Sequence, residues 1–133
     1  MTARPTLGLC LCVAAGGAVG AVLRLGAGEW VPDGSGFPWT TFAINVSGSL
    51  LLALLPALAA VRRSPAWAAA LGPGVLGGYT TLSACAEQGR ALLADGDTAL
   101  GAAYLVGTLG ASWVAVLLAT TLTRRRVPAE EPR

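Results

Sequence analysis

Long apolar stretches are the feature that most constrains this chain, because a helix without polar surface needs lipid or protein around it. Four stretches reach the roughly 20 residues that a helix needs to cross a bilayer core of about 30 Å. They cover residues 7–25, 39–61, 67–93 and 100–123. Charged residues make up only 12% of the chain, against about a quarter in a soluble domain. We therefore predict an all-α membrane protein with a single domain of four transmembrane helices.

Several functional classes are disfavoured by the residues present. The chain has no histidine, which removes the commonest general base and a common metal ligand. Cys10 and Cys12 could form part of a metal site, but without further ligands we interpret them as small buried hydrophobes. Paired carboxylates and a nucleophile beside a base are also lacking, so we predict that the chain is not an enzyme. We expect no nucleic acid partner.

Charge is distributed unevenly between the two ends of the predicted bundle. All nine basic residues are arginine. Four antiparallel spans put both termini and the 62–66 connector on one side, which holds Arg4, Arg62, Arg63, Arg124, Arg125, Arg126 and Arg133. The other side has Arg24 and Arg90 near helix ends, with the acids Glu29, Asp33, Asp95 and Asp97. Because arginine-rich connectors stay inside the cell, we predict a multi-pass protein of the cell membrane with both termini cytoplasmic.

Small and polar residues recur at helical spacing inside the spans. Gly16, Gly17 and Gly20 in the first span, and Gly107 and Gly110 in the fourth, predict close helix packing. Two stripes of neutral polar residues recur every four positions, which places each stripe on one helix face. The stripes are Thr41, Asn45 and Ser49, and Tyr104, Thr108 and Ser112. Such residues often bond across helices, but two stripes on different helices favour a lined path that suits a small anion.

The third span contains glycines and hydroxyls where a bilayer is driest. Residues 77–83 read Gly-Gly-Tyr-Thr-Thr-Leu-Ser and follow Pro73 closely. Glycine weakens a helix by about 1 kcal/mol relative to alanine, so we predict a third helix broken near mid-membrane. Carbonyls freed there cost several kcal/mol each unless they are satisfied, and they are suitable ligands for Na⁺. The alternative is a kink that serine and threonine side chains repair.

Three motifs occur in order along the chain. Residues 16–21 read Gly-Gly-Ala-Val-Gly-Ala and precede Arg24; residues 37–41 read Phe-Pro-Trp-Thr-Thr and precede Asn45 and the pair at 48–49; the third motif is 77–83. Together these motifs resemble the Fluc-type fluoride channels, also called CrcB. The resemblance covers nearly the whole chain.

The resemblance implies a fluoride-specific ion channel that exports fluoride from the cytoplasm and lowers its toxicity. It implies an antiparallel, dual-topology dimer in the lipid bilayer with two pores along its interface. A structural Na⁺, not transported, would be bound at the dimer centre by the backbone carbonyls of Gly77 and Thr80 from each subunit. The implied fluoride pathway comprises Asn45, Ser83, Tyr104, Thr108 and Ser112, with Leu82 and Cys85 at further pathway positions. Arg24 matches the family's first-helix arginine and is expected to be structural.

The chain departs from the family pattern directly after the break. The family reads Thr-Thr-Phe-Ser-Thr-Phe, whereas Leu82, Ala84 and Cys85 stand here for Phe, Thr and Phe. An aromatic ring edge is electropositive, and neither leucine nor a thiol replaces it. The family's acid falls at Gln88, whereas this chain has Glu87 one place earlier. We interpret Glu87 as a solvated vestibule residue rather than a proton relay.

The missing phenylalanines and the uneven charge suggest one subunit of a heterodimer. A homodimer inserted both ways needs nearly balanced arginines at its two ends, so our hypothesis is a homologous partner with the opposite bias and an inverted insertion. A homodimer and a non-conducting scaffold subunit remain alternatives. A small multidrug exporter is a weaker one, because it needs a membrane-embedded carboxylate in its first helix and residues 7–25 contain none.

Overall fold

The computed structural model describes residues 6–124, and this part of the chain is helical throughout, without strands. Three elements are long and apolar enough to cross a membrane: Leu7–Trp30, Trp39–Ala57 and Thr98–Thr123. The first is helix α1 (Leu7–Trp30), the second consists of α2 (Trp39–Leu54) and a 3₁₀ turn, η1 (Leu55–Ala57), and the third lies in α7 (Thr98–Arg124). The all-helical prediction is therefore confirmed.

The remaining traverse, which is the third in chain order, is a row of short elements rather than one helix. It begins with α4 (Pro65–Ala69), continues through a π-helix, η2 (Ala70–Leu76), and a single turn, α5 (Gly77–Tyr79), and ends in α6 (Leu82–Ala94). Pro73 lies inside the π-helix. Between α5 and α6 the backbone of Thr80 and Thr81 is extended. The predicted break is confirmed at these two residues, while its depth in the bilayer stays a prediction.

Two helices end at residues other than the predicted span boundaries. The first helix does not end at residue 25 but continues to Trp30, because Gly26 and Gly28 lie in helix and only Pro32 enforces a stop. A proline disfavours helical backbone in the residue before it. The second span is not one helix to residue 61, since the turn at Pro56 separates α2 from α3 (Ala59–Arg63). The Arg62 side chain stabilises this turn by donating to the carbonyls of Pro56 and Ala57.

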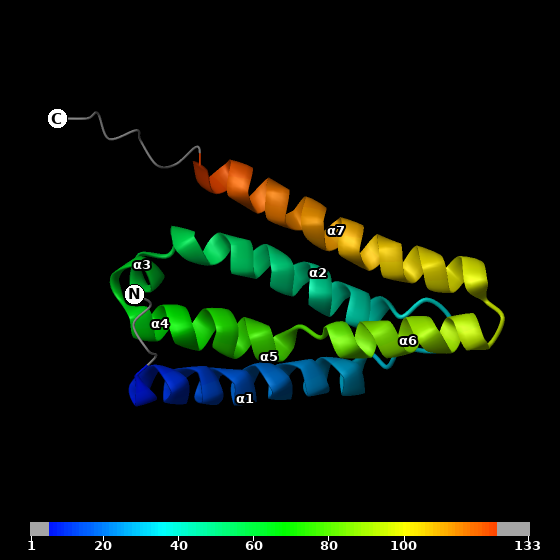
Figure 1. Ribbon diagram of the computed structural model, residues 1–133, viewed down its shortest axis with the longest axis horizontal. Helices are drawn as coiled ribbons and strands as arrows, with labels where there is room; N and C mark the ends of the chain where they lie inside the picture. Colours follow the sequence, from blue (N-terminus) through cyan, green and yellow to red (C-terminus); the bar gives the residue numbers. More distant parts are fainter. Residues whose placement is uncertain (1–5, 125–133) are drawn as a thin grey trace.

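Consecutive traverses run in opposite directions, so equivalent ends gather together (Figure 1). The start of α1, the end of α7 and the short helix α3 lie at one end of the molecule, with the α1–α2 loop and the α6–α7 turn at the other. This arrangement agrees with the predicted antiparallel order. Four of the arginines behind the orientation prediction, Arg4, Arg125, Arg126 and Arg133, lie outside the described residues.

Glycines bring α1 against the broken traverse. A Cβ atom added to Gly16 or Gly20 would overlap the backbone carbonyl of Ala70 or Val75, respectively. The predicted close packing of the first span is thus confirmed. The prediction for the fourth span was wrong within this chain, because a Cβ added to Gly107 or Gly110 meets no atom within 4 Å.

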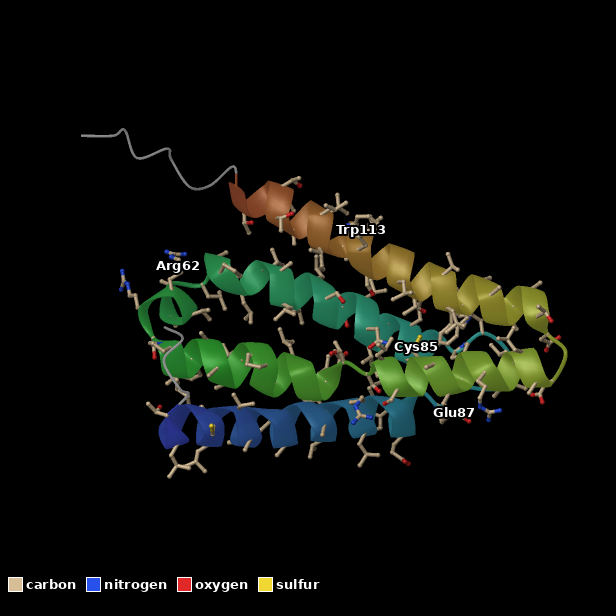
Figure 2. All side chains as sticks on the ribbon, in the orientation of Figure 1. Arg62, Cys85, Glu87 and Trp113 are labelled. Carbon is tan, nitrogen blue, oxygen red and sulfur yellow. The ribbon has the colours of Figure 1, made fainter. Side chains whose placement is uncertain are left out.

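The interior is small, and much apolar surface faces outward. The buried hydrophobic residues are Ile44, Leu76, Cys85, Leu92, Tyr104, Ala115 and Ala119. By contrast, Trp113 is 69% exposed and points away from the other helices (Figure 2). Such a surface needs lipid or another protein chain around it, as the transmembrane prediction requires.

Candidate ion pathway and helix break

The side chain of Asn45 holds the backbone at the break. Its Oδ1 accepts a hydrogen bond from the Thr81 N–H at 2.8 Å, and its Nδ2 donates to the Thr81 carbonyl at 3.0 Å. Asn45 lies on α2 and is only 9% exposed. Unpaired backbone groups would be costly in a membrane, so one amide takes the place of the two helical partners that Thr81 lacks.

Other side chains satisfy some of the remaining groups. The Thr80 hydroxyl donates to the carbonyl of Leu76 at 2.9 Å, and the Thr81 hydroxyl accepts from Ala84 N–H at 3.1 Å, which caps α6. Arg24 Nε donates to the carbonyl of Gly78 at 3.2 Å. Hydroxyl repair, considered above as an alternative, therefore operates here. Arg24 has the structural contact expected of it, joining α1 to the broken traverse.

The carbonyls of Gly77 and Thr80 are among those that this repair leaves over. The hydrogen bonds of the described residues include none to the carbonyl oxygens of Gly77 or Thr80. Both residues line a groove of about 360 Å³ that is also bounded by Gly48, Ser49 and Pro73. Free carbonyls beside an open groove are suitable hard-oxygen donors for a Na⁺ ion, so these residues fit the predicted site.

Four of the predicted pathway residues lie inside the chain. Asn45, Cys85, Tyr104 and Thr108 are all buried, and Cys85 lies at the start of α6 on the side of α2 (Figure 2). Thr108 donates its hydroxyl proton to the carbonyl of Tyr104 at 2.7 Å, and Ser49 donates to the carbonyl of Asn45 at 2.8 Å. At these positions the polar stripes bond to their own helices.

The other predicted residues lie on the outer surface of the single chain. Leu82 is 72% exposed, Ser83 and Gly77 are also exposed, and Ser112 is half-buried. Leu82 and Ser83 lie on the exposed face of α6, whereas Cys85 lies on its buried face. The structure therefore does not bring all the predicted pathway residues together within one chain.

A carboxylate in the α1–α2 loop links three elements, and its role was not predicted from the sequence. Asp33 accepts hydrogen bonds from the N–H groups of Thr40 and Thr41 at 2.7 and 3.2 Å and from the Thr41 hydroxyl at 2.8 Å. It also accepts from Gln88 Nε2 at 3.1 Å, while Gln88 Oε1 accepts from the Tyr104 hydroxyl at 2.7 Å. Asp33 lies well before the start of α2, outside the usual capping spacing, so sequence pattern gives little signal for it.

Partial burial raises the pKa of Asp33, but the hydrogen bonds from Thr40, Thr41 and Gln88 together outweigh it. They hold the pKa of this carboxyl below its usual value of 3.8. Asp33 is therefore ionised at neutral pH. It also lines a cavity of about 620 Å³ with Arg24, Glu29 and Thr81, which reaches from the loop to the break.

Glu87, by contrast, points away from α2 and α7 (Figure 2). Its carboxylate pairs with Arg90 at 2.6 Å, and both side chains are about two-thirds exposed, at 65% and 66%. An exposed pair of this kind contributes little to stability. The exposure of Glu87 agrees with its interpretation as a solvated residue.

Comparison with known proteins adds an independent observation. The sequence profile of a family described as "CrcB-like protein, Camphor Resistance (CrcB)" matches residues 11–120. The fluoride-specific ion channel FluC of Rhizobium meliloti (strain 1021) is 43% identical over 121 residues, which are 88% of this chain and 97% of that protein.

Two further relatives come from other bacteria. Fluoride-specific ion channel FluC 1 of Streptomyces coelicolor is 42% identical and covers 85% of this chain and 75% of its own length. The fluoride-specific ion channel FluC of Thermus thermophilus is 41% identical, covering 74% of this chain and 80% of its own length. With the profile and these relatives spanning most of the sequence, the chain belongs to the CrcB family.

Proposed function

We propose that this chain is a subunit of a fluoride-specific ion channel that lets fluoride leave the cytoplasm and so lowers its toxicity. The observation that carries the proposal is its identity of more than 40% to curated relatives named as fluoride-specific ion channels over most of both sequences. Those relatives are named as channels rather than as enzymes. The Asn45-held break supplies local support, since a break in lipid persists only where the backbone is satisfied.

A structural Na⁺ at the break is part of this proposal. The carbonyls of Gly77 and Thr80 would hold it, together with the same groups of a second subunit. When bound, the ion would neutralise carbonyl dipoles that remain free in the single chain. This chain's own contribution is positional: Arg24 fixes Gly78, next to Gly77, and Asn45 fixes Thr81, next to Thr80.

The fluoride pathway would run along the surface that carries Ser83, since an anion needs donors that it can reach. The Ser83 hydroxyl is exposed and lies 3.2 Å from the Thr81 hydroxyl. Asn45 uses one of its two N–H bonds for Thr81 and retains the other. Ser112 extends the path on α7, where it is half-buried. Thr108 contributes packing, because its proton is committed to Tyr104.

Dimerisation is required by this arrangement, because part of the pathway is on the outer surface of each chain. We propose an antiparallel pair in the cell membrane, surrounded by lipid, in which this chain has both termini in the cytoplasm. The arginine bias favours a homologous partner inserted the other way over a second copy of this chain. Leu82 and Cys85 also favour a heterodimer, since a partner with the family's phenylalanines would supply the missing ring edges.

The alternative of a multidrug exporter receives little support. The observed α1 is longer than predicted and includes Glu29, which lies in the last turn of the helix. Family membership outweighs this single acid.

Reconstitution in liposomes tests the proposal. We expect fluoride efflux, followed with a fluoride-selective electrode, without chloride efflux under the same gradient. Asn45→Asp is expected to abolish the flux, because it removes the donor to Thr81, whereas the exposed Thr121→Ala is a matched control that should not. Flux that requires a co-expressed homologue supports the heterodimer. Equal fluoride and chloride efflux, or efflux unaffected by Asn45→Asp, contradicts the proposal.

A further inference from the structure

We propose that Asp33 acts through Gln88 to commit the Tyr104 hydroxyl proton, so that Tyr104 is an anchor of the pathway wall and not a group that donates to fluoride. This inference deepens the proposed function and rests on it, because only that proposal makes fluoride the transported ion. Its basis is the hydrogen-bond chain from the α1–α2 loop through α6 to α7.

The direction of the chain follows from Asp33. An ionised carboxylate can only accept hydrogen bonds, and Asp33 Oδ2 lies 3.1 Å from the Gln88 amide. The NH₂ group of Gln88 must therefore face Asp33, which turns its carbonyl oxygen, Oε1, toward Tyr104. Although the two ends of an amide look alike, a fixed acceptor on one side decides the orientation.

The orientation of Gln88 in turn decides that of Tyr104. Gln88 Oε1 has no proton, so the Tyr104 hydroxyl must be the donor of the 2.7 Å bond between them. A phenol has only one proton. With that proton on Gln88, Tyr104 presents lone pairs to other groups, which would repel an anion rather than bind it.

Burial and packing make this arrangement rigid. Tyr104 is 0% exposed, and the Phe37 ring lies edge-on to it with ring centroids 5.3 Å apart. Asp33 is fixed separately by three bonds from Thr40 and Thr41 at the start of α2. Those three bonds explain Asp33 as a helix cap, but they do not require the fourth bond, from Gln88.

The neutral side chain of Gln88 is compatible with an ionised Asp33 beside it. A glutamate at position 88, where the family pattern has an acid, would place a second carboxylate beside Asp33. Two carboxylates at this distance cannot both ionise without a large cost. A neutral amide in α6 is therefore the side chain that accommodates an ionised acid in the loop.

Raman spectroscopy of the tyrosine doublet tests the relay, because its intensity ratio distinguishes a donating phenol from an accepting one. The chain has two tyrosines, so Tyr79→Phe leaves Tyr104 as the only reporter. In that background we expect a donor signature that does not change when fluoride is added. Asp33→Ala removes the acceptor that orients Gln88, lets that amide invert, and should convert Tyr104 to an acceptor.

A double variant provides the rescue. Asp33→Ala combined with Gln88→Glu leaves residue 88 with acceptor oxygens only, so the donor signature of Tyr104 should return. Gln88→Met removes the acceptor altogether and serves if Asp33→Ala does not fold. A donor signature that persists in Asp33→Ala or in Gln88→Met would overturn the relay.

Measurement of fluoride efflux distinguishes a Tyr104 that anchors the pathway wall from one that donates a hydrogen bond to fluoride. Losing a hydrogen-bond donor to a charged ion should slow fluoride efflux about tenfold or more, so we expect Tyr104→Phe to stay within about threefold of the wild type. A larger loss in protein of unchanged thermal stability would overturn the proposal. Because the Raman measurement needs no transport, a wild-type chain that fails to conduct would count against the proposed function and leave the relay to be judged on the spectrum.

Discussion

At the scale of single residues, the Asn45 amide has the largest structural role. Asn45→Ala removes both partners of Thr81 and leaves a partly buried N–H and a partly buried carbonyl unpaired. Each costs about 1–3 kcal/mol, so we expect a clear fall in the thermal unfolding midpoint of the protein in detergent. Thr120→Ala is the matched control, since its hydroxyl bonds only within its own exposed helix face. Equal midpoints for the two variants would show that Asn45 does not hold the break.

Restoring the family's phenylalanines should affect stability differently at positions 82 and 85. Cys85 is 2% exposed, and a phenylalanine there overpacks the interior at a cost of about 1–3 kcal/mol. Leu82 is 72% exposed, so Leu82→Phe should leave the unfolding midpoint of the single chain nearly unchanged. Denaturation in detergent measures both. A stable Cys85→Phe variant would mean that the interior has room that the structure does not show.

Acid should weaken the contribution of Asp33. Its pKa is held below 3.8, so the stability it provides is fully present above pH 3.8 and is lost as pH falls through the lower, folded value. We therefore expect the difference in unfolding midpoint between the wild type and Asp33→Asn to be constant from pH 7 to about pH 4 and to shrink below that. A difference that grows on acidification would contradict the sign of the shift.

At the scale of elements, α1 depends on two glycines that accept no side chain. Gly20→Ala puts a methyl group into the Val75 carbonyl and should destabilise the protein by at least about 1–3 kcal/mol. Gly26→Ala lies on the same helix with open space around it and should instead stabilise by about 0.5–1 kcal/mol. Opposite signs of the change in unfolding midpoint are the expected result. Similar changes would mean that α1 does not pack closely on η2.

The elements also show how far sequence reasoning reached. The lengths of the apolar stretches predicted all four traverses, and the glycines before Thr80 and Thr81 predicted the position of the break. Propensity could give neither the π-helix around Pro73 nor the extension of α1 to Trp30. Gly26 and Gly28 are weak helix formers that stay helical because nothing competes for their backbone.

The candidate site was predicted less completely than the fold. Asn45 was identified, but as a pore donor rather than as the partner of Thr81. Periodicity assigns a residue to a helix face without saying what lies opposite. It therefore could not separate buried Tyr104 and Thr108 from exposed Ser83, nor connect Asp33 with Gln88 across 55 positions.

At the scale of the whole molecule, the arginine bias predicts a single insertion. Reporter tags fused to each terminus should place both tags in the cytoplasm in essentially every molecule. Arg62→Glu combined with Arg63→Glu weakens the bias and should increase the inverted fraction. A wild-type chain found in both orientations would remove the charge argument for a heterodimer and favour a homodimer.

The tie between Asn45 and Thr81 has a consequence for how a cell would use this protein. Both backbone groups of Thr81 at the break are hydrogen-bonded to Asn45 on α2. We therefore expect that the break does not act as a hinge or a gate. We expect an ion pathway of constant shape. The fluoride flux through each channel would then depend only on the concentration gradient and the membrane voltage. The cell would adjust its resistance to fluoride by the number of channels that it makes.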